Sequence, residues 1–171
     1  MALREDQIQR YSRQILLREV GGRGQARLLE AVIVVEGQSD ALDVAVAYLA
    51  ASGTPLREAR PTARAGFLEG ATLGDFSVDA VARPEAPARG WLGPLTQGPG
   101  APTTCFRVGV ASGLVVGVPA HAPWPTEAGA VVEAEPVTVG ALAALVVQRF
   151  VLGLEAGLVT VRAADGQWQR S

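Results

Sequence analysis

The sequence has no lysine, since all 15 of its Lys and Arg positions are arginines. A chain without lysine has no side-chain amine for Schiff-base chemistry, for a P-loop phosphate contact or for isopeptide attachment. It also has a single cysteine, Cys105, and a single histidine, His121. These counts exclude an internal disulfide framework and any zinc site of the Cys₄ or Cys₂His₂ type. We therefore expect no metal site.

Long hydrophobic runs are absent as well. The longest, residues 140–147, is far shorter than the roughly 20 apolar residues that cross a bilayer. Residues 1–9 are polar and charged, without the apolar segment of a secretory signal. The formal net charge is −2, which argues against a nucleic-acid-binding protein. We expect a cytoplasmic protein that contacts neither membrane nor nucleic acid, and one free cysteine is consistent with a reducing compartment.

What is present is a globular composition, with 49% hydrophobic and 19% charged residues in a chain of 171. That length suits one domain. Apolar residues at three- and four-residue spacings predict a helix over 5–19, and a second short helix is expected over 24–29. The β-branched run 31–35 indicates a buried parallel strand. Ser39 or Asp40 can cap the following helix, 41–51, which ends at Ser52 and Gly53.

The rest of the chain contains further strands and one long helix. Strands are expected over 56–60 and 76–82, followed by a Pro- and Gly-rich loop over 83–103. A hairpin is expected over 105–119 and a loop over 120–136. A helix should then extend from Thr138 or Gly140 to Leu152, before a closing hairpin over 158–162 and 167–170. We predict an α/β fold with a Rossmann-like, mainly parallel sheet flanked by helices. An N-terminal helical arm (1–30) precedes a single domain (31–171), which ends in an antiparallel hairpin.

The first fifty residues carry a resemblance to a known family. Residues 10–17 read R-Y-S-R-Q-I-L-L, residues 21–29 read G-G-R-G-Q-A-R-L-L, and V-I-V-V-E-G-Q-S-D-A follows. This order resembles the start of the ThiF/MoeB/HesA family, the bacterial relatives of ubiquitin-activating enzymes. The specific similarity covers residues 10–53, and a weaker one extends over most of the chain. The family adenylates the C-terminal glycine of ubiquitin-like or sulfur-carrier proteins.

The resemblance implies a role for the arginine motif, which comprises Arg10, Tyr11, Arg13 and Gln14. In the family, the second arginine of this motif reaches across a dimer interface to the phosphates of ATP in the other subunit, and that residue is Arg13 here. A guanidinium suits this contact because it offers paired donors and stays charged. The alternative is that Arg13 serves only the interface, paired with a carboxylate.

The nucleotide loop of the family, G-x-G-G-x-G, is not preserved. The same place reads Glu36, Gly37, Gln38, Ser39 and Asp40. A phosphate cradle needs glycines that let backbone N–H groups approach the anion. Two carboxylates beside a triphosphate would repel it, with no lysine to offset them. We interpret this segment as a plain strand-to-helix turn that does not bind ATP.

Other landmarks of the family are also missing. Glu58 is in an unmatched place for the acidic residue that holds the ribose, Asp79 is the one remnant of the D-x-x-D-N element, and the N-x-x-R-Q and paired C-x-x-C motifs are absent. Cys105 reads as a buried structural cysteine rather than a thioester nucleophile. His121 is a lone loop histidine without a partner motif. We identify no catalytic residue.

These observations predict a catalytically inactive ThiF/MoeB-like pseudoenzyme. It would form a homodimer, or a heterodimer with an intact ThiF-like enzyme whose ATP site Arg13 completes, and would hold no cofactor itself. A ubiquitin-like or sulfur-carrier protein is the other candidate partner, bound at the hydrophobic sheet face. Two different functions stay open: a homodimeric scaffold unrelated to adenylation, and an enzyme with new pocket chemistry that uses Asp79, Glu36 or His121.

Overall fold

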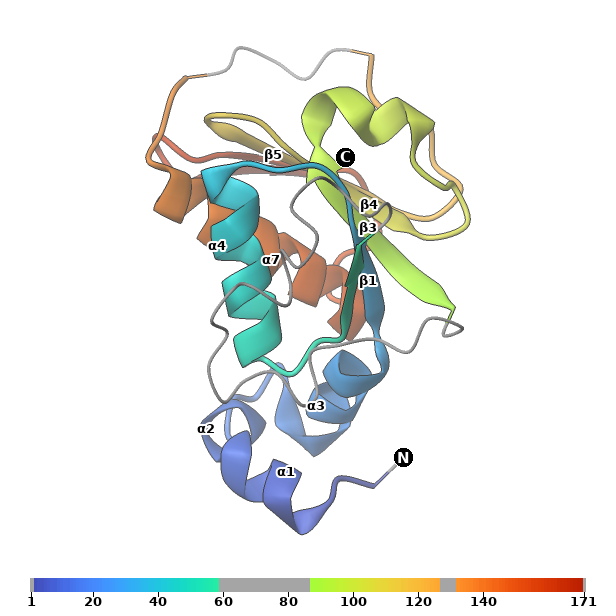
Figure 1. Ribbon diagram of the computed structural model, residues 1–171, viewed down its shortest axis with the longest axis vertical. Coiled ribbons are helices and arrows are strands. Elements are labelled where there is room, and N and C mark those ends of the chain that lie inside the picture. Colours follow the sequence, from blue (N-terminus) through green and yellow to red (C-terminus); the bar gives the residue numbers. More distant parts are fainter. Residues whose placement is uncertain (1, 59–86, 127–131, 171) are drawn as a thin grey trace.

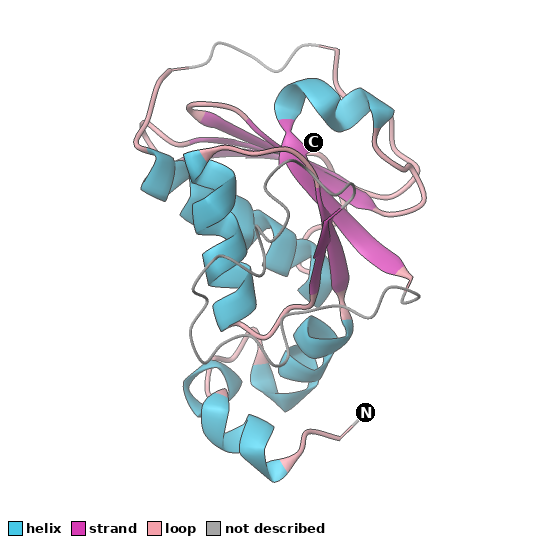
Figure 2. Cartoon of the chain, viewed as in Figure 1, coloured by secondary structure: helices cyan, strands magenta, loops and turns pink. Residues whose placement is uncertain are grey.

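The protein is described from a computed structural model, and the structure describes residues 2–58, 87–126 and 132–170. Its strands form one twisted sheet, with two long helices packed side by side along one face (Figure 1). Three short helices extend from one end of the molecule, at the N-terminus (Figure 2). The predicted α/β fold with an N-terminal helical arm is confirmed. In the described part of the chain, no helix has the length and apolar character needed to cross a membrane.

The first half of the sheet is parallel. It consists of β1 (Val32–Val35), β2 (Leu56–Glu58), β3 (Ala88–Pro94) and β4 (Phe106–Val110). β1 lies between β2 and β3, where Ile33 pairs with Leu56 on one side and with Gly90 on the other. β4 then pairs with β3. The chain therefore leaves β1 for neighbours on both sides, as doubly wound folds do.

The second half of the sheet is antiparallel. Here β5 (Leu114–Val118), β6 (Val159–Arg162) and β7 (Gln167–Arg170) follow β4, in the overall order β2-β1-β3-β4-β5-β6-β7. The predicted hairpin over 105–119 is β4–β5, and the predicted closing hairpin is β6–β7. Asp165 and Gly166 form the turn of the latter, with Gly166 at φ +66°. The sheet is thus mixed, and its parallel strands are those nearest the N-terminus.

Two helices, α4 (Asp40–Ala51) and α7 (Pro136–Leu152), cover one face of the sheet. They approach closely because Gly140 of α7 lies against the backbone of Ala41 and the side chain of Val44. One hydrophobic core beneath them extends from Ile33 on β1 to Val161 on β6. The core therefore joins the parallel and antiparallel halves of the sheet.

The N-terminal arm contains α1 (Glu5–Arg10), α2 (Ser12–Ile15) and α3 (Gly21–Glu30). The predicted helix over 5–19 is thus two helical pieces divided at Tyr11, and α3 is longer than the predicted 24–29. Gln25 of α3 is fully buried, and its amide donates to the carbonyl of Ser52 at 2.8 Å. This bond fastens α3 to the chain that leaves α4.

The prediction of a loop over 83–103 is wrong in its middle, because Ala88–Pro94 forms β3 and Leu95–Gly100 forms a 3₁₀ helix, η2. Trp91 and Leu92 are almost completely buried in this strand. Glycines that suggested a loop instead make room for aromatic rings, since a side chain at Gly90 would overlap the ring of Phe106. The predicted strand 76–82 lies outside the described residues, as do parts of the predicted loop 120–136.

Candidate functional site

The arginine motif lies where α1 meets α2, and its members have different surroundings. Tyr11 is 2% exposed, and its ring packs against Gly53 just beyond α4. Gln14 is half-buried, whereas Arg10 and Arg13 are exposed. Among the described residues, nothing forms a hydrogen bond or ion pair with Arg13. Tyr11 therefore anchors the arm to the domain, while Arg13 is available to a group outside the described chain.

Apolar side chains next to Arg13 are also exposed. Leu16 is 85% exposed and Leu17 54%, and Ile8 on α1 is 42% exposed. Arg13, Leu16 and Leu17 are three and four residues apart in a helical turn, a spacing that places them on one side of it. We call Ile8, Arg13, Leu16 and Leu17 the arm surface. An exposed apolar cluster of this kind, with a cation beside it, is typical of a protein contact.

Residues 36–40, which the sequence analysis compares with the nucleotide loop of the family, each have a local structural role or face solvent. Glu36 accepts a 2.9 Å hydrogen bond from the indole N–H of Trp91. Gly37 has φ +76°, and a Cβ there would lie 2.7 Å from Cγ of Pro94. Ser39 caps α4 by accepting a 3.2 Å hydrogen bond from the amide of Leu42. Gln38 and Asp40 are exposed. Packing against Trp91 and Pro94, together with the cap of α4, thus holds this segment in place.

A cavity of about 330 Å³ lies beside this loop, at the carboxyl ends of β1, β3 and β4. This edge is the switch point of the sheet, where doubly wound proteins bind ligands. Among its described lining residues the sole ionisable side chain is Asp40, and the others are polar or apolar: Gln38, Ser39, Ala41, Pro94, Val110, Ala111, Ser112, Ala134, Pro136 and Val139. The described lining residues of this cavity therefore offer no cation to a phosphate.

An open cleft of about 500 Å³ adjoins this cavity and shares Ala134 and Pro136 with it. Glu133 and Glu135 line the cleft, and they precede α7. Helix N-termini ordinarily favour anions. Here Asp40, in the first turn of α4, and the two glutamates supply that negative charge from the chain itself. The described residues at this end of the sheet therefore present carboxylates, which would repel a polyphosphate.

The remaining candidates are not gathered into one site. Cys105 is 4% exposed, its thiol lies 3.6 Å from the carbonyl oxygen of Pro102, and burial raises its pKa above the usual value. This fits the predicted structural cysteine. His121 lies on an exposed turn with φ +64°, and Asp79 lies outside the described residues. Among the residues that the structure describes, no group of three or more His, Cys, Asp or Glu is placed to hold a metal ion.

Arg107 is a residue that the sequence analysis missed. It is 1% exposed on β4 and donates through Nη2 to the carbonyl of Ala122. Its guanidinium lies 5.7 Å from the ring centroid of Trp124, and its Nε has no hydrogen-bond partner within the described residues. An arginine inside the run F-R-V-G-V was the available signal, because a charged residue in a buried strand is rare.

Comparisons with known proteins give structural neighbours only. No protein-family model matches the chain, and no curated protein sequence matches it. The solved structure of PaaA aligns with a TM-score of 0.57 and 13% identity, over 99% of this chain and 74% of PaaA. E. coli MccB aligns with a TM-score of 0.52 and 13% identity, over 95% of this chain and 69% of MccB.

At this identity the likeness shows a shared fold. PaaA and MccB therefore support the Rossmann-like α/β fold of this chain and no particular activity. The roles of individual residues are not carried over by a likeness of this kind.

Proposed function

We propose that this protein is a non-adenylating subunit of the ThiF/MoeB type that binds an intact adenylating enzyme through its N-terminal arm and supplies Arg13 to the nucleotide site of that enzyme. The observation that carries the proposal is the exposed, unpaired Arg13 beside the 85% exposed Leu16. Leucines in water favour burial in an interface. A guanidinium next to them can reach an anion on the bound protein.

The packing of residues 36–40 supports the assignment of ATP binding to the partner enzyme. Gly37 packs against Pro94, and Glu36 is held by Trp91, so opening this segment for a triphosphate would break both contacts. The adjacent cavity presents Asp40 rather than a cation. ATP would consequently be held by the partner and not by this chain.

The arm is attached to the domain on both sides of Arg13. Tyr11 is buried on the domain side of the α1–α2 junction, and Gln25 of α3 bonds to Ser52 beyond α4. These two anchors flank Arg13 in sequence. A cation that acts on another subunit needs such positioning, because a geometric error weakens an electrostatic contribution to catalysis.

The test uses an adenylating enzyme with an intact G-x-G-G-x-G loop from the same genome. Calorimetry with magnesium ATP should detect no binding to this chain alone and binding to the mixed complex. Arg13→Ala should lower the ATP–pyrophosphate exchange rate of the complex at least about tenfold, by analogy with arginines supplied in trans. Arg23→Ala is the matched control, since Arg23 is an exposed arginine on α3. ATP binding by this chain alone, or equal rates for both variants, would refute the proposal.

A second candidate, a homodimeric scaffold, is favoured by one specific observation. Asp40, Glu133 and Glu135 line adjoining hollows at the end of the sheet opposite the arm, and no described residue pairs with them. The arm surface of a second copy could bring Arg13 to them. Sedimentation of the pure chain distinguishes the two functions. A dimer lost on Leu16→Asp and Arg13→Glu, without any effect on an adenylating enzyme, would favour the scaffold.

A further inference from the structure

A further cavity lies at the end of the sheet where the parallel strands begin, opposite the end that holds residues 36–40. This cavity, of about 310 Å³, is formed at the starts of β3 and β4, the end of β5 and the last turns of α7. Its lining residues are Ala88, Arg89, Thr104, Cys105, Phe106, Pro119, Ala120, Phe150, Val151 and Glu155. We call it the amino-edge cavity. None of these residues belongs to the arm surface or to residues 36–40.

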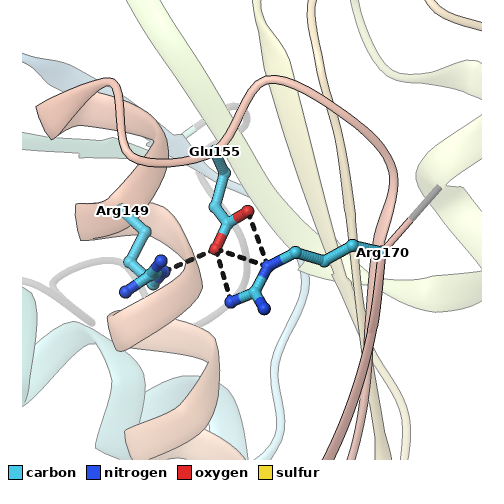
Figure 3. Close-up of polar contacts among 3 residues, drawn as sticks. All are labelled: Arg149, Glu155 and Arg170. Atoms are coloured by element: carbon cyan, nitrogen blue, oxygen red, sulfur yellow. Dashed lines mark hydrogen bonds and ion pairs between the residues drawn. The ribbon is translucent and has the colours of Figure 1, made fainter.

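One wall of the amino-edge cavity is a cluster of charges around Glu155. Its carboxylate accepts a 2.6 Å hydrogen bond from Nε of Arg149, on α7, and two bonds of 3.1 Å from Nη2 and Nε of Arg170, on β7. Figure 3 shows the two guanidiniums converging on this carboxylate from different elements. The hydrogen bonds from Arg170, and then those from Arg149, lower the pKa of Glu155 although burial opposes this. The negative charge of Glu155 is thus paired with the guanidinium groups of both Arg149 and Arg170.

Arg89 is the one guanidinium among the described lining residues of the cavity, which it reaches from β3, and it is exposed. No described residue forms a hydrogen bond or an ion pair with it. The carboxylate of Glu155, which also lines the cavity, is paired with Arg149 and Arg170, and neither of these two arginines is a lining residue. The charge of Glu155 is thus offset, and Arg89 is left as the cation that a small anion in the cavity would meet.

The floor of the cavity is aromatic. The rings of Phe106 and Phe150 stack with centroids 5.1 Å apart and planes 11° from parallel. Both residues line the cavity, and they offer apolar surface to a ligand. A volume of about 310 Å³ falls at the lower end of the range for small-molecule sites. A ligand that fits this floor has an apolar or aromatic body no larger than one or two rings.

We propose that the amino-edge cavity binds a small organic carboxylate, with the carboxylate paired to Arg89 and the apolar body against Phe106 and Phe150. A guanidinium forms charge-assisted, bidentate hydrogen bonds with a carboxylate. Thr104, another lining residue, has a hydroxyl that can donate to it. Glu155 also lines the cavity, and its carboxylate is already paired with Arg149 and Arg170. This proposal is independent of the proposed function, because none of the residues that line the amino-edge cavity belongs to the arm surface or to residues 36–40.

Cys105 makes the proposal measurable. It is the single cysteine of the chain and contributes to the lining of the amino-edge cavity, while its side chain packs with Trp91 and Ala101, so its alkylation reports on the strand start that forms part of the cavity. Burial keeps the thiol largely protonated, and a neutral reagent such as iodoacetamide should therefore modify it slowly. A ligand in the cavity should slow it further.

The experiment measures alkylation of Cys105 by iodoacetamide, together with ¹H–¹⁵N NMR shifts, during titration with benzoate or with benzamide. Benzamide has the same ring without the charge. Benzoate should protect Cys105 and shift amide signals of residues 88–90 and 104–106, with a dissociation constant at least about tenfold lower than that of benzamide. Arg89→Gln should abolish this difference while leaving benzamide binding unchanged. Arg23→Gln, which removes an exposed arginine far along the chain, should preserve it.

Two results would overturn the proposal. One is equal affinity for benzoate and benzamide in the wild type, which would mean that the charge is not recognised. The other is binding of benzoate that Arg89→Gln and Arg23→Gln weaken alike, which would mean that the anion associates with surface arginines generally. Urea denaturation of both variants shows whether either loses binding through unfolding, and Arg89→Lys gives a folded variant in which the charge is kept but the bidentate geometry is lost.

Discussion

At the scale of single residues, Glu155 connects the last helix to the last strand. Its side chain is 4% exposed, whereas those of Arg149 and Arg170 are 29% and 52% exposed. Glu155→Gln keeps an acceptor but removes the charge, which leaves two guanidiniums facing a neutral amide. Because both arginines are partly solvated, we expect a loss of about 2 kcal/mol in the free energy of unfolding, measured by urea denaturation at pH 7.

The same substitution predicts a pH dependence. The folded-state pKa of Glu155 lies below its ordinary value of 4.5, so the ionised carboxylate stabilises the fold. This contribution is fully present above about pH 5 and is lost as the pH falls through the folded pKa. The stability difference between wild type and Glu155→Gln should therefore be constant from pH 6 to 8 and shrink in acid, by analogy with other paired carboxylates. A difference that grew in acid would contradict the pairing.

Gly37 and Gly166 allow two sources of strain to be separated. Both have positive φ, +76° and +66°, but a Cβ at Gly37 would lie 2.7 Å from Pro94, whereas nothing lies within 4 Å of one at Gly166. Gly166→Ala should cost about 1 kcal/mol from the backbone alone. Gly37→Ala adds overpacking and should cost about 3 kcal/mol in total. Thermal unfolding of both variants tests this, and equal costs would mean that Pro94 moves aside freely.

At the scale of elements, the helix after β1 depends on its cap. Ser39 has extended backbone angles, and its hydroxyl accepts from the amide of Leu42. Ser39→Ala should therefore lower the free energy of unfolding by about 1 kcal/mol, and Ser39→Asp should retain the cap. Chemical denaturation followed by circular dichroism measures both. A loss of stability in Ser39→Asp as large as in Ser39→Ala would show that the cap is not the cause.

The elements that could be predicted from the sequence are those in which local signals agree with burial. The run at β1, the cap at Ser39 and the end at Gly53 together define strand, turn and helix, and the Asp-Gly turn defines β6–β7. β3 could not be predicted this way, because its glycines indicate a loop unless the rings beside them are known. The exposure of Arg13 and the burial of Arg107 likewise depend on tertiary packing, which no local pattern encodes.

The amino-edge cavity likewise depends on tertiary packing and could not be predicted from the sequence. Arg89, Cys105 and Glu155 are far apart in the sequence and belong to no recognisable motif. They meet because parallel strands β3 and β4 begin at one edge, and because α7 ends there. Arg149 reaches Glu155 from α7, and Arg170 reaches it from β7, which the pairing with β6 holds in place. Sites assembled by topology in this way become visible in a structure and stay hidden in a single sequence.

At the scale of the whole molecule, the two halves of the sheet should unfold together. One continuous core lies under α4 and α7, from Leu56 on β2 to Val161 on β6. Val147 of α7 is fully buried in it. Val147→Ala should therefore destabilise both halves equally, by about 2 kcal/mol. This expectation follows from the single core that both halves of the sheet share.

Single-tryptophan variants make this cooperativity measurable. With two tryptophans replaced by phenylalanine, Trp91 reports on the parallel half and Trp168 on the closing hairpin. Both fluorescence signals should change at the same urea concentration, and Val147→Ala should move both midpoints equally. The β6–β7 hairpin contacts the shared core and is also attached to α7 through Glu155. A variant that combines Val147→Ala with Glu155→Gln weakens both attachments and tests whether the hairpin still unfolds together with the rest of the sheet. If Trp168 then unfolds first while Trp91 does not, the shared core is too weak to hold the hairpin, and the domain has two folding units rather than one.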